Sequence, residues 1–102
     1  MNVTSRVRLS NSRRDDEGEY VGRPTPLGNP FVMRDESERD EVCDKYARWF
    51  AQMLVEQPPN VMNQLLSLRE KLRLQGVLTL RCWCAPKRCH AESIKQWLEG
   101  GS

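Results

Sequence analysis

The chain has 102 residues, of which 38% are hydrophobic and 29% charged, and its formal net charge is +2. A chain of this length can form one hydrophobic core but not two, so we expect a single domain over residues 1–102, with residues 1–5 and 99–102 flexible. No apolar run reaches the ~20 residues of a membrane span, and the N-terminus lacks the apolar segment of an export signal. We therefore expect a cytoplasmic protein without membrane contact, whose cysteines are thiols.

Basic residues gather in the C-terminal third of the chain. Residues 69–102 contain seven Lys or Arg and three Asp or Glu. This local excess suits a ligand that carries phosphate. A nucleic-acid groove normally needs a more basic domain, so nucleic acid is a weakly supported partner. The alternative is an ordinary solvated helix face.

Two short strands and a stiff loop are predicted near the N-terminus. Residues 3–10 alternate apolar and polar side chains, which is typical of a half-buried strand, and residues 19–21 can form a second, very short strand. Residues 22–31 contain three prolines and two glycines. Proline lacks an N–H and restricts the residue before it, so this segment is neither helix nor inner strand. We expect a stiff surface loop there, called below the proline loop.

Apolar residues at helical spacing predict two helices in the middle of the chain. The first has Ser37 as its expected N-cap and ends at Pro58. The second has Asn60 as its expected N-cap and Gly76 as its C-terminal stop. We interpret the large side chains of the first helix as core rather than as a base-stacking platform; they are Val42, Tyr46, Trp49, Phe50, Met53 and Leu54.

The clearest predicted strand covers residues 77–84 and is followed by a last short helix that begins at Cys89 or His90. One face of this strand carries Leu78, Leu80, Cys82 and Cys84. Two strands separated by two helices favour parallel pairing. The sequence therefore predicts a small α/β domain, with a short, mostly parallel sheet packed against about three helices.

Three of the four cysteines and the only histidine lie within residues 82–90, where the last strand ends and the last helix begins. Unpaired N–H groups at a helix N-terminus favour anions and thiolates. Cys84 or Cys89 could therefore be a nucleophile, and His90 or Glu92 could act as acid or base. The candidate catalytic residues are His90, Glu92 and Cys84. Alternatively, the cysteines fill apolar space and His90 is a hydrogen-bonded capping residue.

Zinc binding is a further interpretation of the same cluster. Cys82, Cys84, Cys89 and His90 supply the elements that zinc prefers. Their spacing is unfavourable, because Cys82 and Cys84 would lie about 6–7 Å apart along a strand. The adjacent Cys89 and His90 would point about 100° apart at a helix start. We predict no metal and no other cofactor, and a zinc-stabilised module stays an alternative.

The proline loop and the strand ends supply the candidate ligand-binding residues. Arg23 offers a planar fork for phosphate, and Asn29 can both donate and accept. Gly28 lets another group approach the backbone closely. If the first and last strands are parallel, further candidates lie near their shared edge: Asn11, Arg13, Arg81 and Arg88. The alternative is a rigid loop whose apolar residues fill the core.

Two motifs of this chain also occur together in other proteins. The stretch Gly22-Arg23-Pro24…Leu27-Gly28-Asn29-Pro30-Phe31 and the stretch Cys82-Trp83-Cys84-x-Pro86-x-x-Cys89-His90 stand near its two ends. In this the chain resembles a family of small bacterial and bacteriophage domains of unknown function, with patterns G-R-P-x-x-L-G-N-P-F and C-W-C-x-P-x-x-C-H-G-D. The similarity runs from about Leu9 to Leu98, and Ala91-Glu92 departs from the pattern's Gly-Asp. The resemblance implies an α/β domain, a pocket built from both motifs, and a phage or prophage origin.

These observations predict a domain that binds a nucleotide or another phosphate-bearing small ligand between the proline loop and the cysteine-rich junction. Such a domain could be a transferase or a hydrolase. The alternatives are a phage protein that binds a host protein without catalysis, and the zinc-stabilised binding module.

Overall fold

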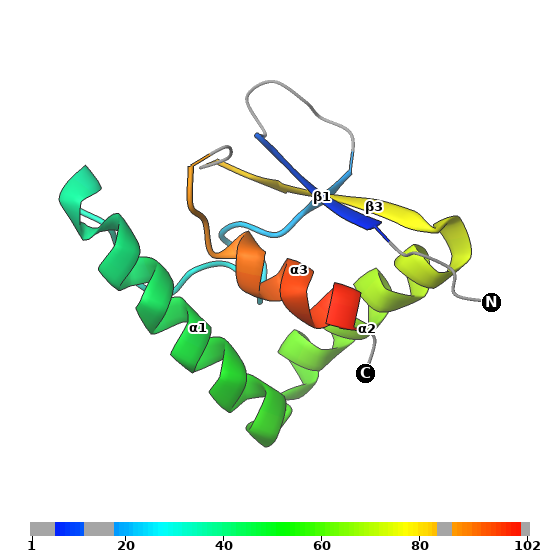
Figure 1. The fold of residues 1–102 in the computed structure, drawn as a ribbon. Helices are drawn as coiled ribbons and strands as arrows, with labels where there is room; N and C mark the ends of the chain where they lie inside the picture. Colours follow the sequence, from blue (N-terminus) through cyan, green and yellow to red (C-terminus); the bar gives the residue numbers. More distant parts are fainter. Residues whose placement is uncertain (1–5, 12–17, 84–86, 101–102) are drawn as a thin grey trace.

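The computed structural model describes residues 6–11, 18–83 and 87–100 (Figure 1). The predicted α/β architecture is confirmed, with three helices and a three-stranded parallel sheet. In chain order the elements are β1 (Arg6–Asn11), β2 (Glu19–Tyr20), a short 3-10 helix η1 (Glu36–Glu38), α1 (Arg39–Glu56), α2 (Pro59–Gln75), β3 (Val77–Cys82) and α3 (Ala91–Gly100).

The sheet has the order β1-β3-β2, and both outer strands run parallel to β3. Leu80 of the central strand is paired with Leu9 on one side and with Glu19 on the other. Successive side chains of β3 alternate between a buried and a more exposed face. The buried face carries Leu78, Leu80 and Cys82, as the sequence predicts.

The helices form the second layer of the molecule, on one side of the sheet (Figure 1). α3 contacts β1 and β3 as well as α1 and α2, and α2 contacts β3. Within the described part of the chain, no helix is both long and apolar enough to cross a membrane.

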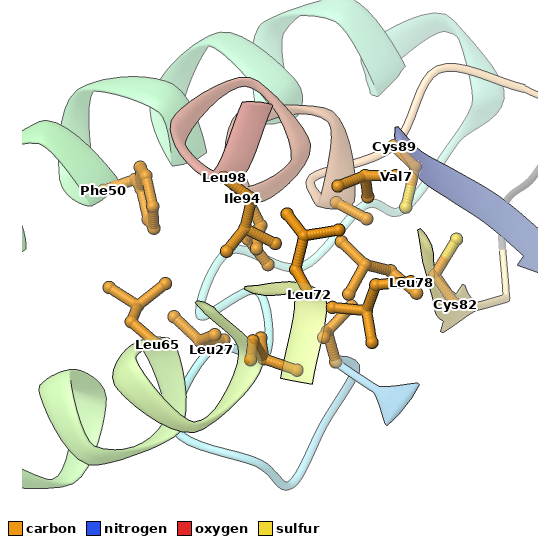
Figure 2. Close-up of a cluster of buried hydrophobic side chains, with 14 of the residues drawn as sticks. Val7, Leu27, Phe50, Leu65, Leu72, Leu78, Cys82, Cys89, Ile94 and Leu98 are labelled. Atoms are coloured by element: carbon orange, nitrogen blue, oxygen red, sulfur yellow. The ribbon is translucent and has the colours of Figure 1, made fainter. Parts of the chain in front are cut away.

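The helices α1, α2 and α3 and the central strand β3 each contribute fully buried side chains to the core, among them Tyr46, Leu65, Ile94 and Leu80. Leu27 of the proline loop is also fully buried, so the loop contributes to the core. Figure 2 shows Phe50 at one end of this cluster and the two thiols of Cys82 and Cys89 at the other. The cysteine-rich junction is therefore anchored in the same core as the proline loop.

Two of the predicted helix caps are wrong. Ser37 lies inside η1, and its N–H donates to the side chain of Asp35 at 3.2 Å. α2 begins at Pro59, so Asn60 is the second helical residue and the extended Pro58 is the N-cap. A proline at the first helical position has no N–H, so it removes one of the unpartnered donors of the helix start and makes a polar cap less necessary.

Other predicted boundaries differ from the structure by a few residues. β1 extends to Asn11, beyond the predicted end of the first strand, while residues 3–5 lie outside the described residues. Gly76 ends α2 as predicted, with a left-handed φ of 78°. α3 includes the expected tail residues 99 and 100, and the Glu99 carboxylate accepts a hydrogen bond from the Val7 N–H at 3.0 Å.

Candidate functional site

A cavity of about 190 Å³ opens where the proline loop, the start of α1 and the junction before α3 meet. We call it the loop–junction cavity. Its lining includes Arg23, Asn29 and Phe31 from the loop, Arg39, Val42 and Cys43 from α1, and Trp83, Arg88, Cys89 and His90 from the junction. Four of the residues expected at a shared site therefore line one cavity: Arg23, Asn29, Arg88 and His90.

His90 forms part of the cavity wall and is held at both ring nitrogens. Its Nε2 lies 2.9 Å from the Val21 carbonyl oxygen, and its Nδ1 lies 3.4 Å from the Cys89 sulfur. Because a carbonyl oxygen can only accept, Nε2 carries a proton and donates it. In the neutral ring, Nδ1 then faces the thiol as an acceptor. The ring also packs edge-on against Tyr46, with 5.0 Å between centroids.

Arg23 is fixed through its backbone and not through its guanidinium. The Trp83 indole N–H donates to the Tyr20 hydroxyl at 2.9 Å, and that hydroxyl donates to the Arg23 carbonyl oxygen at 2.6 Å. The Arg23 side chain lines the cavity, and no hydrogen bond or ion pair joins its guanidinium to residues 6–11, 18–83 or 87–100. An anion that enters the cavity could therefore bind the Arg23 guanidinium without first breaking an ion pair between Arg23 and these residues.

Gly28 and Asn29 shape the end of the proline loop. A Cβ at Gly28 would lie 2.8 Å from both the backbone nitrogen and the Cα of Arg23, so only glycine lets the loop close this tightly. The Asn29 Oδ1 accepts a hydrogen bond from the Phe31 N–H at 2.9 Å. This bond directs the amide oxygen to the backbone, and the Asn29 amide nitrogen has no acceptor among the described residues.

The other two arginines of the cavity are neutralised by carboxylates. The Arg88 guanidinium pairs with Asp44 at 2.7 Å and with Asp40 at 3.1 Å, both on α1, and these hydrogen bonds raise the pKa of Arg88. Arg39 pairs with Glu36 at 2.7 Å and donates to the Arg88 carbonyl oxygen at 2.9 Å. These contacts join the junction to α1, and among the arginines that line the cavity Arg23 is the one without a carboxylate partner in the described part of the chain.

Two predicted site residues lie away from the cavity. The Arg81 Nε donates to the Gly18 carbonyl oxygen at 3.3 Å, and its guanidinium lies 5.8 Å from the Tyr20 ring centroid. Glu92 accepts a hydrogen bond from the Cys89 N–H at 3.2 Å and lines a separate cavity beside β1. Its carboxylate thus supports the start of α3.

The remaining predicted residues are at the ends of β1 and β3. Asn11 lies at the end of β1, where its side-chain amide donates to the Trp83 carbonyl oxygen at 3.3 Å. This bond joins the end of β1 to the junction, but Asn11 does not line the cavity. Arg13 and Cys84 fall outside the described residues.

The cysteines of the structure are thiols, and they form no metal centre among the residues described. Cys43, Cys82 and Cys89 are each buried and in no disulfide. Within residues 6–11, 18–83 and 87–100, no group of three or more His, Cys, Asp or Glu side chains could hold a metal ion. The four-ligand zinc interpretation also requires Cys84, which lies outside these ranges.

The start of α1 is the part of the cavity that sequence reasoning missed. Arg39, Val42 and Cys43 line the cavity from one helix face, at the relative positions i, i+3 and i+4. The same face continues to Tyr46, which the sequence does assign to the core. The predicted apolar stripe already begins at Val42, so its first turn is the signal in the sequence for this wall.

The chain was also compared with known proteins. Residues 5–100 match the model of a family described as a domain of unknown function, DUF4326. The chain belongs to this family. The match confirms the resemblance at the level of the family and extends over all of the described residues. Neither the curated proteins nor the solved structures contain a match to this DUF4326 domain.

Proposed function

We propose that this DUF4326 domain binds a small phosphate-bearing ligand, with a nucleotide as the leading class, in the loop–junction cavity. The observation that carries the proposal is the Arg23 guanidinium, which lines the cavity and has no acceptor among the described residues. Guanidinium groups bind phosphate oxygens through two parallel hydrogen bonds, and they do so more strongly where water is partly excluded.

Other residues of the cavity support the same ligand class. The Asn29 amide nitrogen adds a neutral donor. Phe31 and Trp83 add aromatic surface, and an aromatic face can stack favourably on any nucleobase, because every base has a π-face. The volume is below the ~300 Å³ at which sites for drug-sized ligands begin. We therefore expect the cavity to enclose the phosphate end, with the rest of the ligand lying against Trp83.

If the domain is an enzyme, we propose a transferase or hydrolase in which His90 acts as acid or base. His90 lines the cavity, and histidine is the residue type that normally titrates near neutral pH. Its Nδ1 lies 3.4 Å from the Cys89 sulfur. For Glu92 we propose a structural role at the start of α3 rather than a role as acid or base, because its side chain lines a different cavity.

Thermal unfolding with inorganic phosphate and a panel of nucleotides tests the binding proposal. A ligand present at 100 times its Kd should stabilise the domain by about 2.7 kcal/mol. The change Arg23→Gln should remove most of this gain. Arg73→Gln is the matched control, because Arg73 pairs with Glu70 on the exposed side of α2 and should leave the gain intact. A panel without any stabilising phosphate compound would contradict the proposal.

The alternative, a cytoplasmic phage protein that binds a host protein, has one observation in its favour. Val32 and Trp83 are 65% and 54% exposed; Trp83 lines the cavity, and Val32 lies in the chain between two residues that line it. Exposed apolar side chains of this size suit a protein partner. A stoichiometric host partner that is retained by Arg23→Gln but lost with Val32→Asp would favour this alternative over ligand binding.

A further inference from the structure

Cys89 and His90 form a thiol–imidazole pair in the wall of the loop–junction cavity. The Cys89 sulfur lies 3.4 Å from Nδ1 of His90, and both residues line the cavity although they are only 2% and 8% exposed. The Val21 carbonyl oxygen accepts from Nε2 at 2.9 Å, which fixes the ring and leaves Nδ1 as the acceptor for the thiol proton. Cys89, His90 and the Val21 carbonyl oxygen thus supply a nucleophile, a base and a group that orients the base.

The backbone around Cys89 is held in place independently of this pair. Its N–H donates to the Glu92 carboxylate at 3.2 Å, and its carbonyl oxygen accepts from the Glu92 N–H at 3.1 Å. These two reciprocal bonds place the thiol immediately before the first turn of α3. A helix start of this kind favours the thiolate form, whereas the nearby Glu92 carboxylate opposes it.

We propose that Cys89 is the nucleophile of the cavity, activated by His90, and that it reacts with a small carbon electrophile carrying a leaving group. Nδ1 of His90 takes the thiol proton, and the sulfur attacks the carbon. The new S–C bond forms as the bond to the leaving group breaks, and the leaving group departs with that electron pair. The proposal does not depend on phosphate binding, since neither Arg23 nor Asn29 takes part.

The cavity explains why such a reaction would be selective. Its volume of about 190 Å³ admits only a small electrophile, and Val42 and Phe31 give the wall apolar surface. The other described cysteines provide internal comparisons within the same chain. Cys43 lines the same cavity from α1, and Cys82 is fully buried in the core (Figure 2).

Iodoacetamide alkylation of the native full chain tests the proposal, with each cysteine followed over time by peptide mass spectrometry. Cys89 should be modified at least ~10-fold faster than Cys43 and Cys82, and His90→Gln should slow it by about 100-fold, the scale of general-base assistance. Glutamine can keep a donor to the Val21 carbonyl oxygen but offers no base to the thiol. Equal rates for Cys43 and Cys89, or an unchanged rate in His90→Gln, would overturn the assignment.

A spectroscopic readout separates activation of the thiol from a structural part for His90. At neutral pH the native chain should show ultraviolet thiolate absorbance that is missing in Cys89→Ser. Its loss in a folded His90→Gln variant supports the pair, and its persistence there contradicts it. If His90→Gln does not fold, the comparison with Cys89→Ser decides alone, because a native chain without this absorbance has no activated thiol.

Discussion

At the scale of single residues, Tyr46 connects α1 both to the proline loop and to His90. Its hydroxyl donates to the Leu27 carbonyl oxygen at 2.7 Å in the buried core, and its ring packs edge-on against the imidazole. Burial raises the pKa of Tyr46, so the phenol keeps its proton and stays a donor at any physiological pH. One side chain thus sets the position of two walls of the cavity.

Replacing Tyr46 with phenylalanine should destabilise the domain by about 1–3 kcal/mol, because the buried Leu27 carbonyl oxygen loses its donor while the ring remains. Urea unfolding measures the change. Tyr20→Phe is the matched control, since both hydrogen bonds of the Tyr20 hydroxyl, to the Arg23 carbonyl oxygen and from the Trp83 indole, lie at the surface, where water can replace them. A loss in Tyr46→Phe no larger than in Tyr20→Phe would contradict this account.

The chemistry of His90 could be predicted only in part at this scale. Its place between a cysteine and a helix start is visible in the sequence, and it favours both a capping and a reactive interpretation. Which ring nitrogen faces the thiol depends on the Val21 carbonyl oxygen, which lies 69 positions earlier in the chain. No local pattern contains that contact, because it forms only when the residue just before the proline loop packs against the junction.

At the scale of elements, Glu36 links the short helix η1 to α1 and to the junction. Its carboxylate pairs with Arg39 at 2.7 Å and with Lys87 at 2.8 Å. The hydrogen bonds from Arg39 and Lys87 lower the pKa of Glu36 from 4.5 to about 2. The group is exposed to solvent, so salt should weaken these pairs.

This lowered pKa gives the stability of the domain a predictable pH dependence. The unfolded chain binds the Glu36 proton near pH 4.5 and the folded chain only near pH 2, so the contribution is complete above pH 4.5 and is lost as the pH falls to 2. Glu36→Gln should therefore flatten the fall in Tm over this range, as followed by far-UV circular dichroism. Glu41→Gln, which removes another exposed carboxylate, is the comparison. Parallel pH profiles for Glu36→Gln and the native chain would refute the prediction.

The helices show which structural information is local. The apolar spacing along α1 and α2 predicts both, and Gly76 ends α2 because its left-handed φ suits glycine. The predicted N-caps are wrong because Ser37 and Asn60 are good caps by type, yet Asp35 caps η1, Glu38 is the N-cap of α1 and Pro58 is the N-cap of α2. Choosing between neighbouring candidates depends on the direction of the incoming chain, which tertiary packing decides.

At the scale of the whole molecule, the parallel sheet could be predicted but the completed cavity could not. Strands separated by helices predict parallel pairing, and that pairing brings Asn11 to the level of Cys82. The wall of the cavity that α1 forms depends on how this helix packs. The ion pairs of Arg88 with Asp40 and Asp44 hold the helix against the junction. Charged pairs of this kind are common on surfaces, so the sequence alone does not indicate which of them join distant elements.

Because β3 is the centre of the sheet and of the core, damage to it should unfold the whole molecule rather than one part. Leu80 is fully buried and flanked by both outer strands, so Leu80→Ala should cost about 2–5 kcal/mol, a large share of the 5–15 kcal/mol typical of a folded domain. Tryptophan fluorescence and far-UV circular dichroism should report one coincident transition in urea. Leu74→Ala is the control, because Leu74 is 69% exposed and its loss should change stability by no more than about 0.5 kcal/mol. Equal losses in the two variants, or transitions that separate between the two probes, would show that β3 does not unite the sheet and the helices in one cooperative unit.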